Sequence, residues 1–261
     1  RPWSVIEGPM RLAALFSGGK GSVLAAYLME QQGHSVDVLV SVRPRDPHSW
    51  VFHTPNLKFL PLMAEAMNKE LVAVDSTGTE RDDLRALEDA LSLLEVDGVI
   101  TGAIASDYQW DRINHVCEGL DLNVHSPLWR KDQDLLMEEL IDAGVVAMIV
   151  SVSADGLDAS WLGKRIDHQA LDGLRSIAKS RGMNLAGEGG EYETLVLDSP
   201  LHRRAIRILG SEVESGRDSG LLKVTRAMLE DKKRRVTGSP PMRGRGLATK
   251  REEGCSRRRI S

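Results

Sequence analysis

The chain has 261 residues, of which 41% are hydrophobic, and a net charge of −4. This length suits one large α/β domain or a domain with a smaller companion, and no apolar run approaches the roughly 20 residues that cross a bilayer. Residues 1–200 carry 17 basic and 31 acidic side chains, which argues against a general nucleic-acid-binding surface on that part of the chain.

The two cysteines, Cys117 and Cys255, are expected to remain unpaired. Cys255 lies in a tail that lacks any apolar period, so a structural disulfide between the two is not expected. Unpaired thiols are typical of the reducing cytoplasm.

The first half of the chain alternates short apolar strands with helical periods. Gly33 is expected to end the first helix, and Leu84, Leu87 and Leu91 lie on one face of the third. An alternation of this kind favours a parallel sheet. The predicted elements are strand 11–16, helix 22–32, strand 36–42, helix 58–68, strand 70–74, helix 81–96, strand 97–104 and helix 111–118.

The second half continues the alternation up to about residue 200. The predicted elements are an extended segment at 122–127, helix 132–143, strand 145–154, helix 167–181 and strand 193–200, which ends the ordered body. Beyond residue 237 the chain is rich in Gly, Pro, Ser and Arg and is expected to be disordered. Residues 201–261 carry 17 basic and 7 acidic side chains. They are interpreted as a solvated extension, with contact to RNA or an acidic partner as the alternative.

The hexad "SGGKGS", residues 17–22, stands between the first strand and the first helix. Its glycines let backbone N–H groups turn towards one point, and the start of a helix adds partial positive charge. Ser17 and Ser22 offer hydroxyl donors and Lys20 offers a cation. This combination favours a phosphate or pyrophosphate ligand, although the spacing matches neither the longer P-loop nor GxGxxG.

The hexad resembles the SGGxDS loop of the PP-loop ATP pyrophosphatases, which cleave ATP between its α and β phosphates. Further segments, in the same order along the chain, resemble the diphthine–ammonia ligase family. These are "FHTPN" at 52–56, "TGAIASDYQWDRI" at 101–113, "PLWRKD" at 127–132, "DGLDASWLGKRID" at 155–167 and "GEGGEYETLVLDSP" at 187–200. The resemblance covers about residues 10–210.

The resemblance implies an open, mostly parallel α/β sheet flanked by helices, of the Rossmann-like HUP type, with a smaller C-terminal substrate-binding region. The implied division is a disordered leader at 1–9, a PP-loop nucleotide-binding domain at 10–125 and a substrate-binding region at 126–210. A basic tail at 211–261 follows, largely disordered after about residue 237.

Members of that family complete diphthamide on a histidine of translation elongation factor 2. A carboxylate of the precursor attacks the α-phosphate of ATP, and ammonia then displaces AMP. The resemblance therefore implies a cytoplasmic, AMP-forming amide ligase that uses ATP, Mg²⁺, ammonium and elongation factor 2 carrying diphthine. No membrane attachment and no stable nucleic-acid binding are expected, and a homodimer is retained as a candidate assembly.

The acidic loop "GEGGEYET" is assigned to substrate or Mg²⁺ handling. Three acids within six residues repel one another unless a cation or hydrogen-bond donors balance them. Glu188 and Glu191 are the predicted metal ligands, while Gly189, Gly190 and Glu193 are predicted to meet the substrate. The alternative is a solvated acidic turn.

Five residues are predicted to be catalytic: Lys20, Asp107, Arg112, Glu188 and Glu191. Asp107 and Arg112 lie near a helix start at a spacing that allows both to point at one cleft. Asp107 is expected to orient ammonia or the modified histidine, and Arg112 to hold the phosphate or the carboxylate. The alternative is an N-cap aspartate with a surface arginine. The predicted nucleotide-binding residues are Ser17, Gly18, Gly19, Lys20, Gly21 and Ser22 of the hexad, with Ser41, Thr101 and Gly102 at the ends of two other strands.

Aromatic residues are rare, yet all those between 101 and 200 fall in or beside the family-like segments. Because diphthine carries a trimethylammonium group, and aromatic faces attract such cations, two or more of these rings are predicted to line its pocket. The alternative is ordinary core packing. The rings are Tyr108, Trp110, Trp129, Trp161 and Tyr192, of which all but Trp110 are predicted substrate-binding residues.

Gly21 departs from the family loop, which usually has Asp at this position. An aspartate there can ligate magnesium or shape the loop, and a glycine side chain can do neither. Three explanations of Gly21 stay open. The metal is held by other residues, the protein is an ATP-binding relative with impaired catalysis, or Gly21 is an introduced change. Another PP-loop enzyme, RNA-modifying or amidating a small molecule, is the alternative function.

Overall fold

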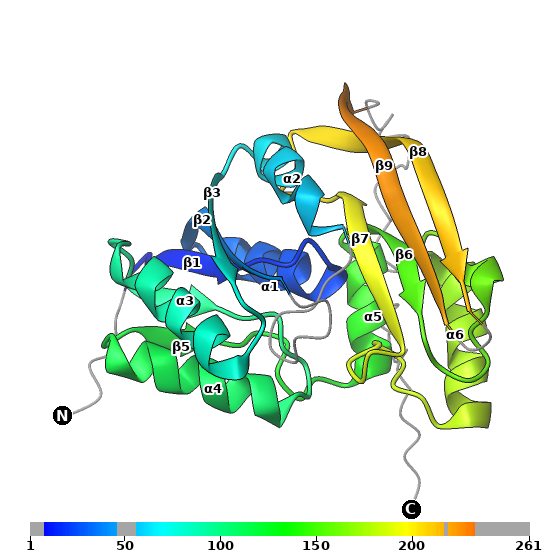
Figure 1. The fold of residues 1–261 in the computed structure, drawn as a ribbon, viewed down its shortest axis with the longest axis horizontal. Coiled ribbons are helices and arrows are strands. Elements are labelled where there is room, and N and C mark those ends of the chain that lie inside the picture. Colours follow the sequence, from blue (N-terminus) through cyan, green and yellow to red (C-terminus); the bar gives the residue numbers. More distant parts are fainter. Residues whose placement is uncertain (1–7, 46–55, 217–218, 233–261) are drawn as a thin grey trace, which may run out of the picture.

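The computed structural model describes residues 8–45, 56–216 and 219–232, which form two sheets (Figure 1). The first sheet has five parallel strands in the order β3-β2-β1-β4-β5, and the second has four antiparallel strands in the order β7-β6-β9-β8. The predicted open parallel α/β sheet with a smaller C-terminal region is confirmed.

The parallel sheet is covered by helices on both faces. Its elements are β1 (Arg11–Leu15), α1 (Lys20–Gln31), β2 (Ser35–Pro44), η1 (Leu57–Phe59), α2 (Leu60–Met67), β3 (Glu70–Ser76), α3 (Glu80–Ser92), β4 (Gly98–Ile100), α4 (Asp107–Gly119) and β5 (Asn123–His125). Leu12, Ala13 and Ala14 of β1 are completely buried, as expected for a central parallel strand. Helices α3 and α4 pack on one face, and α1 and α2 pack on the other.

The second sheet has α5 and α6 packed beside it (Figure 1). Its elements are α5 (Gln133–Asp142), β6 (Val146–Val152), η2 (Ala159–Trp161), α6 (His168–Arg181), β7 (Tyr192–Asp198), β8 (Arg204–Ser215) and β9 (Gly220–Asp231). Asp132 caps α5 by accepting hydrogen bonds from the amides of Asp134 and Leu135 at 2.9 and 3.0 Å. One hydrophobic core joins this sheet to α1 and α2, so the two sheets pack as a unit.

Asn56 connects the two halves of the chain directly. Its side chain donates to the carbonyl of Leu222 at 3.1 Å and accepts from the amide of Val224 at 2.8 Å, both on β9. The residue has a left-handed backbone, with φ of 67°, which asparagine tolerates better than most residues. Arg204 of β8 also pairs with Glu65 of α2 at 2.6 Å.

The β8–β9 hairpin was not predicted from the sequence. The expected end of the ordered body at residue 200 is wrong, and the boundary drawn at 210 falls inside β8. Every second residue at the start of β9 is buried (Gly220, Leu222, Val224), but charged residues stand between and beyond them. That mixture of charges made a strand pair resemble a basic extension.

Two helices begin two or more residues earlier than predicted, and one short element was missed. Helix α1 starts at Lys20, inside the glycine hexad, and α4 starts at Asp107 with Ser106 as its N-cap. The 3₁₀ turn η2 at 159–161 was not predicted. The leader at 1–7, most of the proline-containing loop (46–55), Cys255 and the tail from 233 onwards lie outside the described residues. Of the helices in the described ranges, none is both long and apolar enough to cross a bilayer.

Candidate functional site

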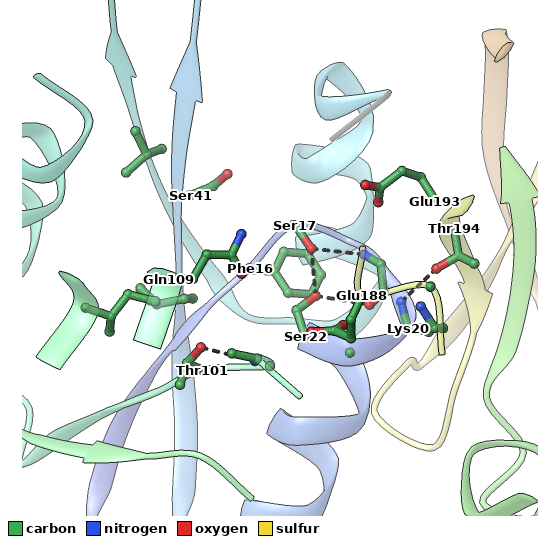
Figure 2. Close-up of a pocket in the computed structure, with 18 of the residues that line it drawn as sticks. Phe16, Ser17, Lys20, Ser22, Ser41, Thr101, Gln109, Glu188, Glu193 and Thr194 are labelled. Carbon is green, nitrogen blue, oxygen red and sulfur yellow. Dashed lines mark hydrogen bonds between the residues drawn. The ribbon is translucent and has the colours of Figure 1, made fainter. Parts of the chain in front are cut away.

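A cleft opens at the carboxyl ends of β1, β2 and β4, where a ligand is expected in an open parallel sheet. Residues of β7 and of the acidic loop before it close the cleft from the second sheet (Figure 2). The polar or glycine residues that line it are Ser17, Gly19, Lys20, Gly21, Ser22, Ser41, Thr101, Gly102, Gln109, Gly187, Glu188, Gly190, Glu193 and Thr194. Eight of the nine predicted nucleotide-binding residues therefore line the same cleft. The ninth, Gly18, belongs to the same loop but does not line the cleft.

The glycine loop leaves β1 and turns sharply into α1. Gly18 has φ of +75°, and a Cβ atom there would lie 2.7 Å from Sδ of Met63, so this position requires glycine. Ser22 Oγ donates to the carbonyl oxygen of Gly19 at 3.0 Å, and Ser17 Oγ accepts from the amide of Gly19 at 3.4 Å. These contacts shape the loop. Gly19 is the N-cap residue of α1 and has no side chain to cap the helix, so the helix start is suited to an anionic ligand.

Lys20 is the buried cation of the cleft. Only 7% of the residue is exposed, and its Nζ lies 4.9 Å from the centre of the Tyr192 ring. Burial lowers the pKa of Lys20, while the negative charges of Glu188, Glu193 and Glu191 act to raise it. No hydrogen bond or ion pair satisfies Nζ within the part of the chain that the structure describes, so a buried ammonium group is left to meet an anion.

Two of the three acids in the loop reach the cleft. Glu188 accepts a hydrogen bond from the amide of Ile104 at 3.0 Å and lines the cleft. Glu193 also lines it, and burial raises the pKa of its carboxyl group to about 7, with Lys20 opposing and Glu188 reinforcing the shift. Figure 2 shows both side chains beside the glycine loop.

Glu191 stabilises its own loop instead of facing the cleft. One of its oxygens accepts from both the amide and the side chain of Asn184 at 2.9 Å, and the other accepts from the amide of Gly189 at 2.7 Å. The predicted pair of metal ligands is therefore separated. In the described residues, no three His, Cys, Asp or Glu side chains gather closely enough to hold a metal ion by themselves. A metal here would need water or phosphate oxygens as additional ligands.

Asp107 and Arg112 lie on the first turns of α4, beside Gln109, which lines the cleft. They do not converge on one point. Asp107 pairs with Arg130 at 3.1 Å, and Arg112 pairs with Glu80 of α3 at 2.8 Å. Sequence spacing indicated a shared direction, but each side chain instead follows a partner on a different element.

The aromatic rings fall at separate places, and none of them lines the cleft described above. Tyr108 donates to Glu80 and stacks under Arg112. Trp110 and Trp129 stack on each other, with ring centres 5.4 Å apart. The remaining two, Trp161 and Tyr192, are apart from these and from each other.

Trp161 packs against Gly173 on α6, where a Cβ atom would lie 2.8 Å from its ring. Tyr192 is 1% exposed, and its hydroxyl donates to the carbonyl of Leu185 at 2.7 Å. The structure thus does not gather the five rings into one cage.

Thr194 is the main cleft residue that the sequence did not suggest. It is 2% exposed and its Oγ1 accepts a hydrogen bond from the amide of Lys20 at 3.0 Å. A threonine at the end of the acidic segment "GEGGEYET", directly before apolar strand residues, is the only signal that the sequence offers for it. Gln109, Leu57 and Phe16 also line the cleft without having been predicted.

Two protein-family models and several curated relatives match this chain over both sheets. The family model described as diphthamide synthase N-terminal domain matches residues 10–124, and that described as diphthamide synthase C-terminal domain matches residues 132–229. A diphthine–ammonia ligase of Danio rerio is 35% identical over 250 residues, covering 85% of this chain and 98% of the relative. The diphthine–ammonia ligase of Homo sapiens is 37% identical over 227 residues, covering 78% and 85%.

Proposed function

The chain belongs to the diphthamide synthase family, and from that premise we propose that it is an ATP-dependent diphthine–ammonia ligase. It joins ammonia to the carboxyl group of diphthine, with AMP and pyrophosphate as the nucleotide products. The protein substrate in this proposal is elongation factor 2 carrying diphthine, which implies a cytoplasmic location. The homodimer stays a prediction.

The buried Lys20 at the start of α1 is the observation that carries the proposal. Its ammonium group is desolvated and lies next to a glycine loop at the carboxyl edge of a parallel sheet. A pyrophosphate leaving group carries several negative charges, so it needs donors and cations that are fixed in advance. Ser17, Ser22 and the first-turn amides of α1 lie around the same point, and the two hydroxyls can turn from their contacts within the loop to donate to a phosphate.

The reaction that we propose has two steps. The diphthine carboxylate attacks the α-phosphorus of ATP, the bond to the β-phosphate breaks, and the loop holds the departing pyrophosphate. Ammonia then attacks the acyl carbon, the nitrogen loses a proton to solvent, and the carbon–oxygen bond to AMP breaks with its electron pair leaving on AMP. Ser41, inside the second half of β2, and Thr101 and Gly102, directly after β4, are proposed to border the nucleoside.

The residues present fit a magnesium ion only together with the phosphates. Glu188 and Glu193 face the cleft and are the proposed protein ligands, because Mg²⁺ is commonly bound by one or two carboxylates plus substrate phosphates. Such an ion would neutralise charge on the departing pyrophosphate. Glu191 and Gly189 act in this proposal by holding the shape of the acidic loop.

The first turns of α4 and the Trp129 turn form the proposed contact surface for diphthine and its carrier protein. Asp107, Arg112, Tyr108 and Trp129 all belong to this rim, which we call the α4 rim. The ring of Tyr192 packs against the ammonium group of Lys20. We keep the proposed division into a nucleotide-binding part and a substrate-binding part, with the second part extended to the end of β9.

The proposal is tested by incubating the protein with diphthine-bearing elongation factor 2, ATP, Mg²⁺ and ammonium. The mass of the factor and the nucleotide products are both followed. We expect conversion of the carboxylic acid to the amide, together with AMP. Formation of ADP, or AMP released without any change in the factor, would contradict the proposal.

A further inference from the structure

Strand β7 belongs to the antiparallel sheet, yet two of its residues bind the glycine loop of the parallel sheet. The amide of Val196 donates to the carbonyl of Gly18 at 2.9 Å. Two residues earlier, Thr194 Oγ1 accepts from the amide of Lys20 at 3.0 Å (Figure 2). The second sheet therefore shapes the loop and also places a hydroxyl group at the start of α1.

The hydrogen-bond capacity of Thr194 is only partly used. A hydroxyl group has one hydrogen to donate and two lone pairs to accept, and the Lys20 amide uses one lone pair. Within residues 8–45, 56–216 and 219–232, no acceptor is found for the hydroxyl hydrogen. Since Thr194 is almost completely buried and lines the cleft, a ligand in the cleft is the available partner, and a buried donor without one is costly.

The ligand that fits this hydroxyl is an anion. Lys20 is more than nine-tenths buried, lines the same cleft and has no anionic partner at bonding distance in the described chain. Oxygens of a phosphate group accept hydrogen bonds and donate none when ionised, so they suit both Lys20 Nζ and the Thr194 hydroxyl.

Although β7 approaches the loop closely, the space beside the Thr194 hydroxyl stays open because residue 19 is a glycine. A Cβ atom on Gly19 would lie 3.4 Å from the carbonyl oxygen of Thr194 and 3.6 Å from its Oγ1. The absence of a side chain at Gly19 thus leaves space directly beside the hydroxyl group. A phosphate oxygen seated over the loop can reach it there.

We propose that Thr194 binds phosphate directly, donating its hydroxyl hydrogen to the pyrophosphate group while accepting from the Lys20 amide. The phosphate site is then built by both sheets. This inference rests on the proposed function, because it assumes that the glycine loop holds pyrophosphate.

The experiment measures pyrophosphate binding to the full chain by calorimetry. Thr194→Val has nearly the same shape and lacks the hydroxyl, whereas Thr194→Ser keeps the hydroxyl and lacks the methyl group. We expect Thr194→Val to weaken binding roughly 10- to 100-fold, because a hydrogen bond to a charged group is lost, and Thr194→Ser to stay within about threefold. Thr225→Val, on the exposed side of β9 away from the cleft, is the matched control and should bind as the wild type does.

Binding of adenosine separates a direct contact from a structural effect. If Thr194 only supports the fold, Thr194→Val should weaken adenosine and pyrophosphate equally, and that result would overturn the inference. So would equal pyrophosphate affinity of wild type and Thr194→Val, or equal losses in the Val and Ser variants. Thr194→Ala, which lacks the hydroxyl without adding an apolar branch, provides the same comparison if the valine variant does not fold. Failure of the wild type itself to bind pyrophosphate would instead count against the proposed function.

Discussion

The backbones of Gly21 and Gly102 are in direct contact, with no room for a side chain between them. A Cβ atom on Gly21 would lie 2.9 Å from the carbonyl oxygen of Gly102, and one on Gly102 would lie 2.6 Å from the carbonyl carbon of Gly21. The family-like loop usually carries Asp where this chain has Gly21. The glycine at position 21 therefore allows the first turn of α1 and the segment after β4 to approach each other closely.

Restoring the carboxylate is expected to cost activity rather than raise it. In Gly21→Asp the new Cβ pushes against backbone, so the segment around Gly102 must move. Gly21→Ala adds the same Cβ without the charge and serves as the steric control. We expect both variants to exchange pyrophosphate into ATP more slowly than the wild type when diphthine-bearing factor is present. An aspartate variant faster than wild type would show instead that the missing carboxylate limits the reaction.

Replacing Lys20 with Met should stabilise the protein without ligand while strongly weakening its affinity for pyrophosphate. Burial lowers the pKa of Lys20, which means that the folded protein disfavours the charged form relative to the unfolded chain. Met retains most of the side-chain volume and carries no charge. We expect a higher urea midpoint and at least a roughly 100-fold weaker affinity for pyrophosphate, since the buried charge is lost. A lower midpoint would mean that attraction to the neighbouring glutamates outweighs desolvation.

His202 should make the fold sensitive to mild acid. Its ring is 4% exposed and hydrogen-bonds Ser199 Oγ at 2.7 Å. Burial lowers its pKa to about 4, with Asp198 opposing and Lys232 reinforcing the shift. A folded-state pKa below the unfolded value of about 6.5 means that protonation favours unfolding. The contribution to stability is present above pH 6.5 and is lost as the pH falls towards 4.

The matched variant is His202→Asn, whose side chain still reaches Ser199 but does not titrate. Between pH 7 and pH 5, urea unfolding of the wild type should lose about 2 kcal/mol more than unfolding of the variant. Parallel pH profiles for the two proteins would contradict this assignment.

Trp129 offers a test of the proposed trimethylammonium contact at the α4 rim. It stacks on Trp110, and the guanidinium of Arg130 lies 5.5 Å from its ring centre, so this ring already attracts a cation. Trp129→Leu should reduce the preference for trimethylated over unmethylated substrate by roughly 2- to 30-fold, the equivalent of about 0.5–2 kcal/mol. Trp161 packs against Gly173 of α6 and does not line the cleft, so Trp161→Leu should leave the ratio of kcat/KM values unchanged. An unchanged ratio in Trp129→Leu would remove this ring from the substrate contact.

The sequence predicted the parts of the site that depend on local chemistry. Gly18, Gly19 and Lys20 could be placed because a glycine turn between a strand and a helix has few other uses, and strand ends such as Thr101 follow from the parallel order. Glu191 could not be separated from Glu188, since a run of acids does not reveal which carboxylates satisfy backbone amides of their own loop. The direction of Arg112 depends on Glu80, which lies 32 residues earlier on another helix.

The β8–β9 hairpin was missed for a related reason. Its stability comes from cross-strand pairing and from α2, and neither partner is visible in a local charge pattern. Thr194 was missed because its role depends on the approach of β7 to Lys20, 174 residues away in the sequence. Long-range contacts of this kind decide which residues of a recognised motif do chemistry and which only hold it in place.

The side chain of Asn56 gives the hairpin a route by which it can respond to the ligand. Leu57, its immediate neighbour, lines the cleft, while Asn56 itself holds two backbone groups of β9. A ligand that displaces Leu57 would therefore act through one amide group on a strand more than 160 residues further along the chain. We expect occupancy of the cleft and the position of the C-terminal strand pair to be coupled through this side chain.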